Sequence, residues 1–320
     1  MTKPFVYITR KISDDVVKDL EEHFEVEMWE QEEEVVPRDL LLRKANQADA
    51  ILSMLTDQID EELLSQSPNL KVVANMAVGY DNIDVNAAKR HQVVVTNTPD
   101  VLTDTTADLT FALLMATARR LPEAIDYIKD DLWKTWSPYM LAGSDLHHKT
   151  LGIVGLGSIG QAVAKRATGF DMNVIYHNRS RKEDVERQLG VQYASFDELL
   201  QQSDYVVCMT PLTEETEGMF DQETFRRMKD TAIFINTSRG GVVNEDDLYQ
   251  ALKQGDIKAA GLDVFQDEPI GADHPLISLN EVVALPHIGS SSIETRTEMM
   301  ELAARNIKKV LNGESPVTPV

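Results

Sequence analysis

The stretch TLGIVGLGSIGQAVAKRATGF, residues 150–170, decides the fold. Gly155, Gly157 and Gly160 form G-x-G-x-x-G directly after a β-branched run and at the start of a helix-compatible stretch. The first glycine permits a tight turn, the second lets the backbone approach a pyrophosphate, and the third lets helix and strand pack closely. The helix N-terminus then holds the phosphates. An ordinary glycine-rich turn is the alternative, but strand, turn and helix in this order favour dinucleotide binding through Gly155, Leu156, Gly157, Ser158, Ile159 and Gly160.

The end of the next expected strand, VIYHNRSRK at 174–182, indicates which dinucleotide binds. An NAD site usually places an acidic residue about 20 residues after the glycines, where it accepts hydrogen bonds from the ribose 2′-hydroxyl. This chain has Asn178, Arg179, Ser180 and Arg181 there instead. An amide, a hydroxyl and cations would neutralise a 2′-phosphate through charge-assisted hydrogen bonds. We therefore predict that NADP(H) is preferred over NAD(H), with a solvated basic turn as the alternative.

Short β-branched runs alternate with polar helical stretches along the chain, which is typical of parallel βαβ units. The first series of expected strands is Phe5–Thr9, Phe24–Trp29, Ala50–Ser53, Val72–Met76 and Val93–Thr96. The second is Leu151–Val154, Asn173–His177, Tyr205–Cys208, Ala232–Asn236, Ala259–Val264 and Val282–Leu285. Between them a helical pattern from about Leu102 to Arg120 is apolar almost all round, which predicts burial between two domains or subunits.

The two series predict an α/β protein with two Rossmann-like, doubly wound parallel-sheet domains and the active site in the cleft between them. The pattern alone does not decide which array the C-terminal helix covers. We expect residues 1–99 plus 291–320 to form a discontinuous, flavodoxin-like substrate-binding domain. Residues 100–290 are then the NADP-binding Rossmann domain.

Two late helices carry clear start and stop signals. Asn244, with Asp247 at the third position, predicts a helix that ends at Gly255. For the last helix, Ser291 and Glu294 predict a capping box at its start. Gly313 predicts its end.

Composition disfavours several classes of function. The 320 residues include 31 Lys+Arg against 53 Asp+Glu, a formal net charge of -22, which disfavours nucleic acid and anionic membrane surfaces as partners. The single cysteine, Cys208, permits no intramolecular disulfide and fits a reducing compartment. The longest apolar block, Phe111–Ala118, is far shorter than the ~20 residues of a membrane span. We expect a soluble cytoplasmic protein, and no residue spacing suggests a metal site.

Five motifs in order indicate a family. They are MAVGYDNID at 76–84, GLGSIG at 155–160, INTSRGGVV at 235–243, GLDVFQDEP at 261–269 and LPHIGSSS at 285–292. Over nearly its whole length the chain resembles the D-isomer-specific 2-hydroxyacid dehydrogenases, and within them the glyoxylate/hydroxypyruvate reductase branch. The resemblance implies reduction of glyoxylate and hydroxypyruvate to glycolate and D-glycerate.

The same resemblance implies three catalytic residues, each chemically suited to its role. Arg239 would bind the substrate carboxylate, because a guanidinium forms a bidentate pair that lysine cannot. His287 would donate the proton to the carbonyl oxygen, since reduction delivers hydride to carbon. Glu268 would hydrogen-bond to His287, orient it and favour its charged form.

Other positions follow from the resemblance alone. The backbone N–H groups of Val78 and Gly79 would bind the substrate carboxylate. Positions on the cofactor side are Thr106, Thr210, Pro211, Thr237, Asp263 and Gly289. Family members use the region that here contains Trp133, Trp136 and Tyr139 to form dimers, so we expect a homodimer with Tyr139–Leu141 near the neighbour's active-site cleft.

Other functions remain open. A 2-ketogluconate or other 2-oxo sugar-acid reductase would use the same three catalytic residues. A phosphoglycerate dehydrogenase is less favoured, because NAD and a regulatory domain usually mark that branch, and a formate dehydrogenase because its substrate has no carbonyl to protonate. A nicotinamide-sensing, co-repressor-like binding protein is the alternative from another class, since fold does not fix function.

Overall fold

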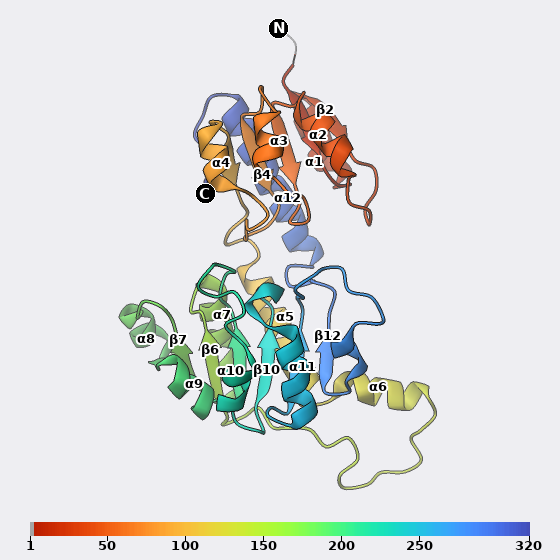
Figure 1. Cartoon of the computed structure of the whole chain (residues 1–320), viewed down its shortest axis with the longest axis vertical. Helices are drawn as coiled ribbons and strands as arrows, with labels where there is room; N and C mark the ends of the chain where they lie inside the picture. The colour runs from red at the N-terminus through yellow and green to blue at the C-terminus, as the bar shows by residue number, and fades with distance from the viewer. Residues whose placement is uncertain (1–2) are drawn as a thin grey trace. The chain divides into compact units, whose positions relative to one another are not determined.

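The computed structural model describes residues 3–320, which divide into two α/β units. One unit is the chain up to Leu102 together with Ser291–Val320, and the other is Thr103–Ser290. Each unit contains one sheet with all its paired strands parallel and with helices packed on it (Figure 1). The expected fold class, two parallel-sheet α/β domains, is therefore confirmed.

The sheet of the first unit has the strand order β2-β1-β3-β4-β5. Its strands are β1 (Phe5–Ile8), β2 (Glu25–Met28), β3 (Ala50–Ser53), β4 (Val72–Asn75) and β5 (Val94–Thr96). Its helices are α1 (Asp14–Glu21), α2 (Arg38–Ala45), α3 (Glu61–Ser65), α4 (Val85–Arg90) and α12 (Ile293–Leu311). Helix α12 packs on β3 and β4 with Met299, Leu302 and Ile307 buried, so the C-terminal helix covers the first array.

The sheet of the second unit has the order β12-β11-β10-β9-β6-β7-β8. Its strands are β6 (Thr150–Val154), β7 (Asn173–His177), β8 (Gln192–Tyr193), β9 (Tyr205–Cys208), β10 (Ile233–Asn236), β11 (Ala259–Leu262) and β12 (Val282–Ala284). Its α-helices are α5 (Thr103–Ala118), α6 (Leu121–Lys129), α7 (Ser158–Ala167), α8 (Glu183–Leu189), α9 (Phe196–Gln202), α10 (Gln222–Arg227) and α11 (Glu245–Gln254). The apolar helix α5 packs on α7, β10 and β11.

The central strands are buried and almost entirely apolar, with polar residues only at their last positions, because helices cover both faces of the sheet. All four residues of β3, β4, β9 and β10 are buried. Two hydrophobic clusters fill the second unit, one around Phe220, Phe225 and Phe234 and the other around Tyr176 and Tyr205. These cores fix the strand ends, and so the loops that follow them.

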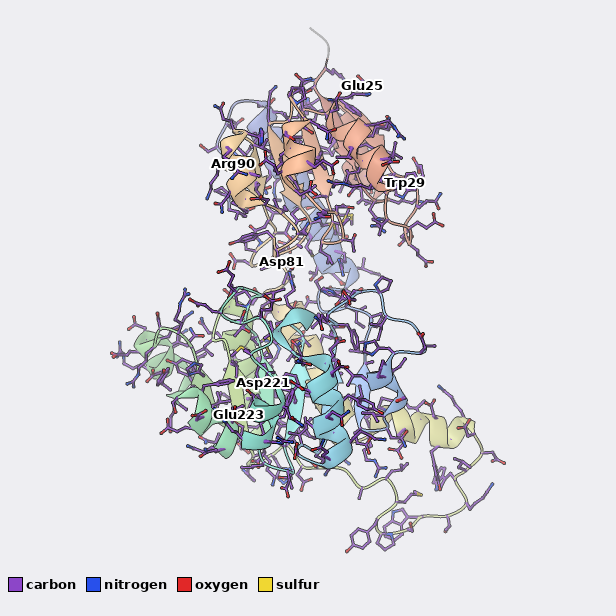
Figure 2. The ribbon with its side chains drawn as sticks, viewed as in Figure 1. Glu25, Trp29, Asp81, Arg90, Asp221 and Glu223 are labelled. Atoms are coloured by element: carbon purple, nitrogen blue, oxygen red, sulfur yellow. The ribbon has the colours of Figure 1, made fainter. Side chains whose placement is uncertain are left out.

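Part of the acidic excess stabilises helix N-termini, where the positive end of the helix dipole favours carboxylates. Asp221 accepts a hydrogen bond from the Thr224 N–H, 2.8 Å away, at the start of α10. Asp221 and Glu223 lie at the start of α10 (Figure 2), and Glu223 in its first turn pairs with Arg227. No helix within residues 3–320 is long and apolar enough to cross a membrane.

The start signal for α11 is correct, whereas that for α12 is wrong by one residue. The Asp247 N–H donates to Asn244 Oδ1 at 3.1 Å, and Gly255 ends α11 in the left-handed conformation. For α12 the N-cap is Ser292, which accepts from the Thr295 N–H at 3.2 Å, and not Ser291. Serines occupy both positions 291 and 292, and either hydroxyl could cap the helix. Glu294 lies three residues after Ser291, and this spacing led to the wrong choice.

Candidate active site

Four polar residues follow three neighbouring strands of the second unit. Arg239 follows β10, Asp263 and Glu268 follow β11, and His287 follows β12. The order β12-β11-β10 makes these strands adjacent, and parallel strands present their carboxyl ends at one edge of the sheet. The expected catalytic residues therefore come from loops at one edge of one unit.

His287 and Glu268 form a hydrogen-bonded pair. His287 Nδ1 lies 2.6 Å from Glu268 Oε2, and the Phe265 N–H donates to Glu268 Oε1 at 2.9 Å. The two side chains are 25% and 26% exposed, so they are held firmly and are still accessible to a small molecule. Because Nδ1 is engaged, the other ring nitrogen, Nε2, is the one that can face a reactant.

The environment keeps the Glu268 carboxyl charged. Burial alone would raise its pKa, but the hydrogen bond and charge of His287, the Phe265 N–H and the positive charge of Arg239 together lower the pKa below its ordinary value. The charge of Arg239 thus acts on the same carboxylate as His287. An ionised carboxylate can only accept a hydrogen bond, so the His287 Nδ1–H donates to Glu268 and the pair fixes the orientation of the ring.

The backbone at His287 is strained. Its φ is +53°, a left-handed conformation that residues other than glycine rarely adopt. The next peptide is fixed, because the Ile288 N–H donates to Asp263 Oδ1 at 2.8 Å. Strain of this kind persists only where surrounding contacts hold it, and it is frequent at functional sites.

Asp263 has one oxygen without a partner. The residue is 1% exposed, and among residues 3–320 its buried Oδ2 atom has no hydrogen-bond partner. Burial raises the pKa of this carboxyl, although the Ile288 N–H, the charge of His287 and the Gly289 N–H oppose the shift. A buried acceptor without a donor is costly, so a ligand N–H here would be favourable. The amide of a nicotinamide ring supplies such a donor.

Two residues of the expected cofactor set are linked through Thr110, Thr237 by its hydroxyl and Thr106 by its backbone carbonyl. Its hydroxyl lies 2.7 Å from Thr237 Oγ1 and donates to the Thr106 carbonyl, also at 2.7 Å. A Cβ on Gly289 would lie 3.2 Å from Asp263 Oδ2 and 3.4 Å from Thr106 Cγ2. The structure therefore gathers Thr106, Thr237, Asp263 and Gly289 in one place.

The loop that carries Arg239 is held by a buried asparagine that the sequence analysis did not single out. Asn236, 1% exposed, donates from Nδ2 to the Arg239 carbonyl at 2.9 Å. Its Oδ1 accepts from the Ser238 N–H at 3.0 Å and from Ser238 Oγ at 2.8 Å. The sequence signal that could have identified Asn236 is its position, because it is the one polar residue in β10 and it ends the strand.

Gly240 brings the loop after β10, which carries Arg239, against the loop after β11, which carries Glu268. A Cβ at this position would lie 1.8 Å from the Phe265 carbonyl carbon and 1.9 Å from its oxygen. Only a residue without a side chain permits this approach. Since the Phe265 N–H also binds Glu268, the contact fixes the loops of Arg239 and Glu268 relative to each other.

The glycine-rich turn has the geometry that its pattern predicts. Gly155 has φ +102°, and a Cβ there would lie 2.7 Å from the Met209 carbonyl. Gly157 is the N-cap of α7, and a Cβ on it would meet no atom within 4 Å. A Cβ on Gly160 would lie 2.3 Å from the Gly155 oxygen. The middle glycine thus faces open space at a helix N-terminus, which fits a phosphate group.

The basic turn after β7 is more constrained than its composition suggests. Asn178 Oδ1 accepts from the Leu156 N–H at 2.8 Å, so this oxygen ties the turn to the glycine loop. Arg181 forms two 2.8 Å hydrogen bonds to Glu186, and hydrogen bonds from Arg181 and Tyr176 lower the pKa of Glu186 to about 2. Arg179 pairs with Glu215 at 3.1 Å but is 86% exposed. Ser180 accepts from Asn178 Nδ2 through its carbonyl, 3.4 Å away.

The end of β9 and the residues after it lie beside the loop after β10 that carries Arg239. Cys208 Sγ lies 3.6 Å from Thr210 Oγ1 and 3.3 Å from Ser238 Oγ, and the Pro211 carbonyl accepts from Thr216 Oγ1 at 2.6 Å. Burial raises the pKa of the Cys208 thiol, which therefore stays protonated and inert. Among residues 3–320 there is no group of three or more His, Cys, Asp or Glu side chains that could hold a metal ion.

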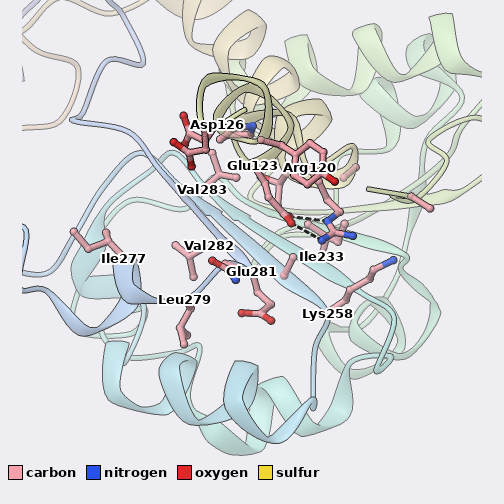
Figure 3. Close-up of a pocket in the computed structure, with 18 of the residues that line it drawn as sticks. Arg120, Glu123, Asp126, Ile233, Lys258, Ile277, Leu279, Glu281, Val282 and Val283 are labelled. Atoms are coloured by element: carbon pink, nitrogen blue, oxygen red, sulfur yellow. Dashed lines mark hydrogen bonds and ion pairs between the residues drawn. The ribbon is translucent and has the colours of Figure 1, made fainter. Parts of the chain in front are cut away.

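A cavity of about 680 Å³ occupies a different part of the second unit (Figure 3). Its lining includes Ile233, Ala259 and Val282, which are the first residues of β10, β11 and β12. Arg120 and Glu123 pair on its wall at 2.7 Å. The cavity therefore lies at the amino ends of the strands whose carboxyl ends carry Arg239, Glu268 and His287, and it is not the candidate active site.

The chain is similar to several known proteins in sequence and in structure. Residues 111–289 match the model of the D-isomer specific 2-hydroxyacid dehydrogenase, NAD binding domain. A glyoxylate reductase of Korarchaeum cryptofilum is 50% identical over 315 residues, 98% of this chain and 95% of the relative. A protein of Thermus thermophilus has a similar structure, with a TM-score of 0.93, 42% identity and 99% of each chain covered. An NADPH-dependent glyoxylate/hydroxypyruvate reductase of Sinorhizobium meliloti, solved with NADP and malonate, is also similar in structure. Its TM-score is 0.87 and its sequence identity 33%, with 100% of this chain and 97% of that chain covered.

Proposed function

Because the chain belongs to the D-isomer-specific 2-hydroxyacid dehydrogenase family, an oxidoreductase family acting on 2-oxo acids, we propose that it reduces glyoxylate and hydroxypyruvate to glycolate and D-glycerate with NADPH. One observation carries the proposal: the 2.6 Å pair of His287 and the ionised Glu268, with the charge of Arg239 acting on the same carboxylate. This is a proton donor, its orienting base and an anion-binding group on three adjacent strand ends.

Each residue has a distinct task in this reaction. Arg239 binds the substrate carboxylate, and the backbone N–H groups of Val78 and Gly79 in the first unit bind it as well. His287 gives the Nε2 proton to the carbonyl oxygen as the carbon is reduced, and Glu268 holds the ring by Nδ1 and stabilises its positive charge.

The second unit fits a nicotinamide dinucleotide, which supplies the hydride when bound. Asp263 Oδ2, which has no partner among residues 3–320, would accept from its carboxamide, and Thr106, Thr237 and Gly289 would line the ring. The backbone from Gly155 to Gly160 holds the pyrophosphate at the start of α7, and Thr210 and Pro211 contact the cofactor. Asn178, Arg179, Ser180 and Arg181 hold the 2′-phosphate. Arg179 is the most exposed cation of this turn and gives NADP its advantage over NAD.

We also propose a cytoplasmic homodimer. Helix α6 has no buried residue, and the segment after it exposes Trp133, Trp136 and Tyr139 by 56%, 74% and 88%. Exposed apolar clusters of this kind mark interaction surfaces. The occupant we infer is a second copy of the chain, with Tyr139–Leu141 near its active site. A sedimentation experiment that finds only monomer at micromolar concentration excludes this dimer.

The reaction is tested by NADPH oxidation, followed by near-ultraviolet absorbance, with glyoxylate, hydroxypyruvate and 2-ketogluconate in parallel. Turnover of the first two substrates supports the proposal, and turnover of 2-ketogluconate alone replaces it with a sugar-acid reductase. NADPH binding without turnover of any 2-oxo acid indicates a nicotinamide-sensing binding protein instead.

The proton donor is tested by His287→Ala, which we expect to abolish most of kcat and to leave NADPH affinity nearly unchanged. The matched control is His91→Ala, because His91 also pairs with a glutamate, Glu61, at 2.8 Å, but on the first unit after α4. We expect the control to keep wild-type turnover. Wild-type kcat in His287→Ala means that another group donates the proton.

A further inference from the structure

The loop after β4 in the first unit has three successive carbonyls fixed by donors of the same unit. The Thr98 N–H donates to the Ala77 carbonyl at 2.8 Å. Asn97 Nδ2 donates to the Val78 carbonyl at 2.8 Å, and Asn75 Nδ2 donates to the Gly79 carbonyl at 3.0 Å. Two of the three donors are side-chain amides, which hold backbone that belongs to no strand or helix.

Fixing a carbonyl fixes the next N–H, because the peptide group is planar and its C=O and N–H point in opposite directions. The Thr98 contact therefore sets the direction of the Val78 N–H, the Asn97 amide that of the Gly79 N–H, and the Asn75 amide that of the Tyr80 N–H. Within residues 3–320 no hydrogen bond engages these three N–H groups. They form a row of three oriented donors directed away from the groups that hold the loop.

Both amides are themselves held in place. Asn75 ends β4 and is 0% exposed, and its Oδ1 accepts from Ser53 Oγ at 3.1 Å on the neighbouring strand. Asn97 follows β5, where its N–H donates to the Thr318 carbonyl at 3.3 Å and its carbonyl accepts from Thr318 Oγ1 at 2.6 Å. Donors that are already oriented bind an anion without the cost of reorganisation.

We infer that Asn97 and Asn75 are positioning residues that orient the Gly79 and Tyr80 N–H groups, beside that of Val78, to bind the substrate carboxylate. This inference rests on the proposed function and adds to it a third N–H donor and the two amides. The carboxylate is present in the substrate and in the transition state alike, so losing an oriented donor weakens binding more than it slows the chemical step.

The experiment compares Asn97→Ala and Asn75→Ala with Asn46→Ala, using the full chain. Asn46 Nδ2 also donates to a carbonyl, that of Gln66 at 2.6 Å, on the same unit but away from this loop. We expect each of the first two variants to raise KM for glyoxylate about tenfold or more, as loss of a hydrogen bond to a charged group does. We expect kcat to change less, and KM for NADPH and the Asn46→Ala kinetics to stay at wild-type values.

Asn75→Ala empties a buried site and can fail to fold, so half-buried Asn97→Ala, whose backbone Thr318 still holds, is the decisive variant. Its affinity for oxamate, an unreactive carboxylate analogue of the substrate, is measured by calorimetry in the presence of NADPH, and we expect it to fall about as much as KM rises.

The outcomes separate the two proposals. A wild-type protein that reduces no 2-oxo acid and binds no oxamate overturns the proposed function and the inference with it. An active wild type together with wild-type KM and oxamate affinity in Asn97→Ala overturns the inference alone, even if the variant has a lower melting temperature.

Discussion

Replacing Gly240 by alanine should disable the site although residue 240 carries no chemistry. The added Cβ would lie 1.8 Å from the Phe265 carbonyl carbon, whereas ordinary contacts begin at 3.4 Å. The two loops must therefore separate by about 1.6 Å, the difference between these distances. The atoms that this Cβ would meet, the carbonyl carbon and oxygen of Phe265, belong to the backbone, so no side chain can rotate away to relieve the clash.

That separation moves Arg239 relative to Glu268 and His287. A misplacement of about 1 Å in a catalytic arrangement can cost about 100-fold in rate, so we expect kcat/KM for glyoxylate to fall about 100-fold or more. KM for NADPH should change less than KM for glyoxylate, because Thr237 and Asp263 at the nicotinamide end lie on the two separated loops, whereas the glycine-rich and basic turns follow β6 and β7. The assay is NADPH oxidation per folded molecule, with circular dichroism and a melting curve to measure the folded fraction.

Two further glycines provide matched controls. Gly169→Ala places its Cβ in open space, since no atom lies within 4 Å, and should keep full activity. Gly241→Ala meets only the flexible end of Leu212 at 3.1 Å and should lose a few-fold at most. If Gly240→Ala keeps kcat/KM within a few-fold of wild type, the contact with Phe265 does not couple the two loops.

Three other changes test the charges. Arg179→Ala should raise KM for NADPH about fivefold to tenfold and leave KM for NADH almost unchanged; an equal rise for both would remove the assignment of the 2′-phosphate site. Burial raises the pKa of Asp57 despite hydrogen bonds from Thr9 and the Met54 N–H, so its stabilising contribution is present in acid and is lost as pH rises through the raised pKa. Asp57→Asn should then raise the free energy of unfolding, measured with urea, by about 1 kcal/mol at pH 8 and by nearly nothing below the ordinary Asp pKa. Equal increases at both pH values would contradict this. The pKa of Glu268 is lowered, so its effect on stability has the opposite pH dependence. Its stabilising contribution is present above the ordinary Glu pKa and is lost as pH falls through the lowered pKa. Glu268→Gln should lower the free energy of unfolding by about 1–3 kcal/mol at pH 7, and this difference from wild type should disappear in strong acid.

Local patterns predicted the elements of the fold well, because each depends on residues close in sequence. The β-branched runs placed the strands to within two residues, and the G-x-G-x-x-G turn indicated how the chain meets α7. The prediction missed α6, although its exposed apolar residues Leu121, Ile125 and Ile128 recur at helical spacing. It also missed β8, which has only two residues, both exposed.

The site was harder to predict where it depends on contacts between distant segments. The resemblance indicated Arg239, Glu268 and His287, but nothing in the sequence showed that Gly240 touches Phe265. The sequence also did not show that the side-chain oxygen of Asn178 accepts a hydrogen bond from the glycine loop. Such contacts come from the way β10, β11 and β12 lie side by side, which no single window of sequence contains.

The final residues of the first unit serve two purposes. Pro319 forms an antiparallel bridge with Thr96, and the Val320 N–H donates to the Val95 carbonyl, so this segment shields the free side of β5. Uncovered strand margins recruit other chains and promote aggregation. Because Thr318 also holds the Asn97 carbonyl, displacing this one segment should uncover β5 and loosen the residue that supports the loop after β4 at the same time.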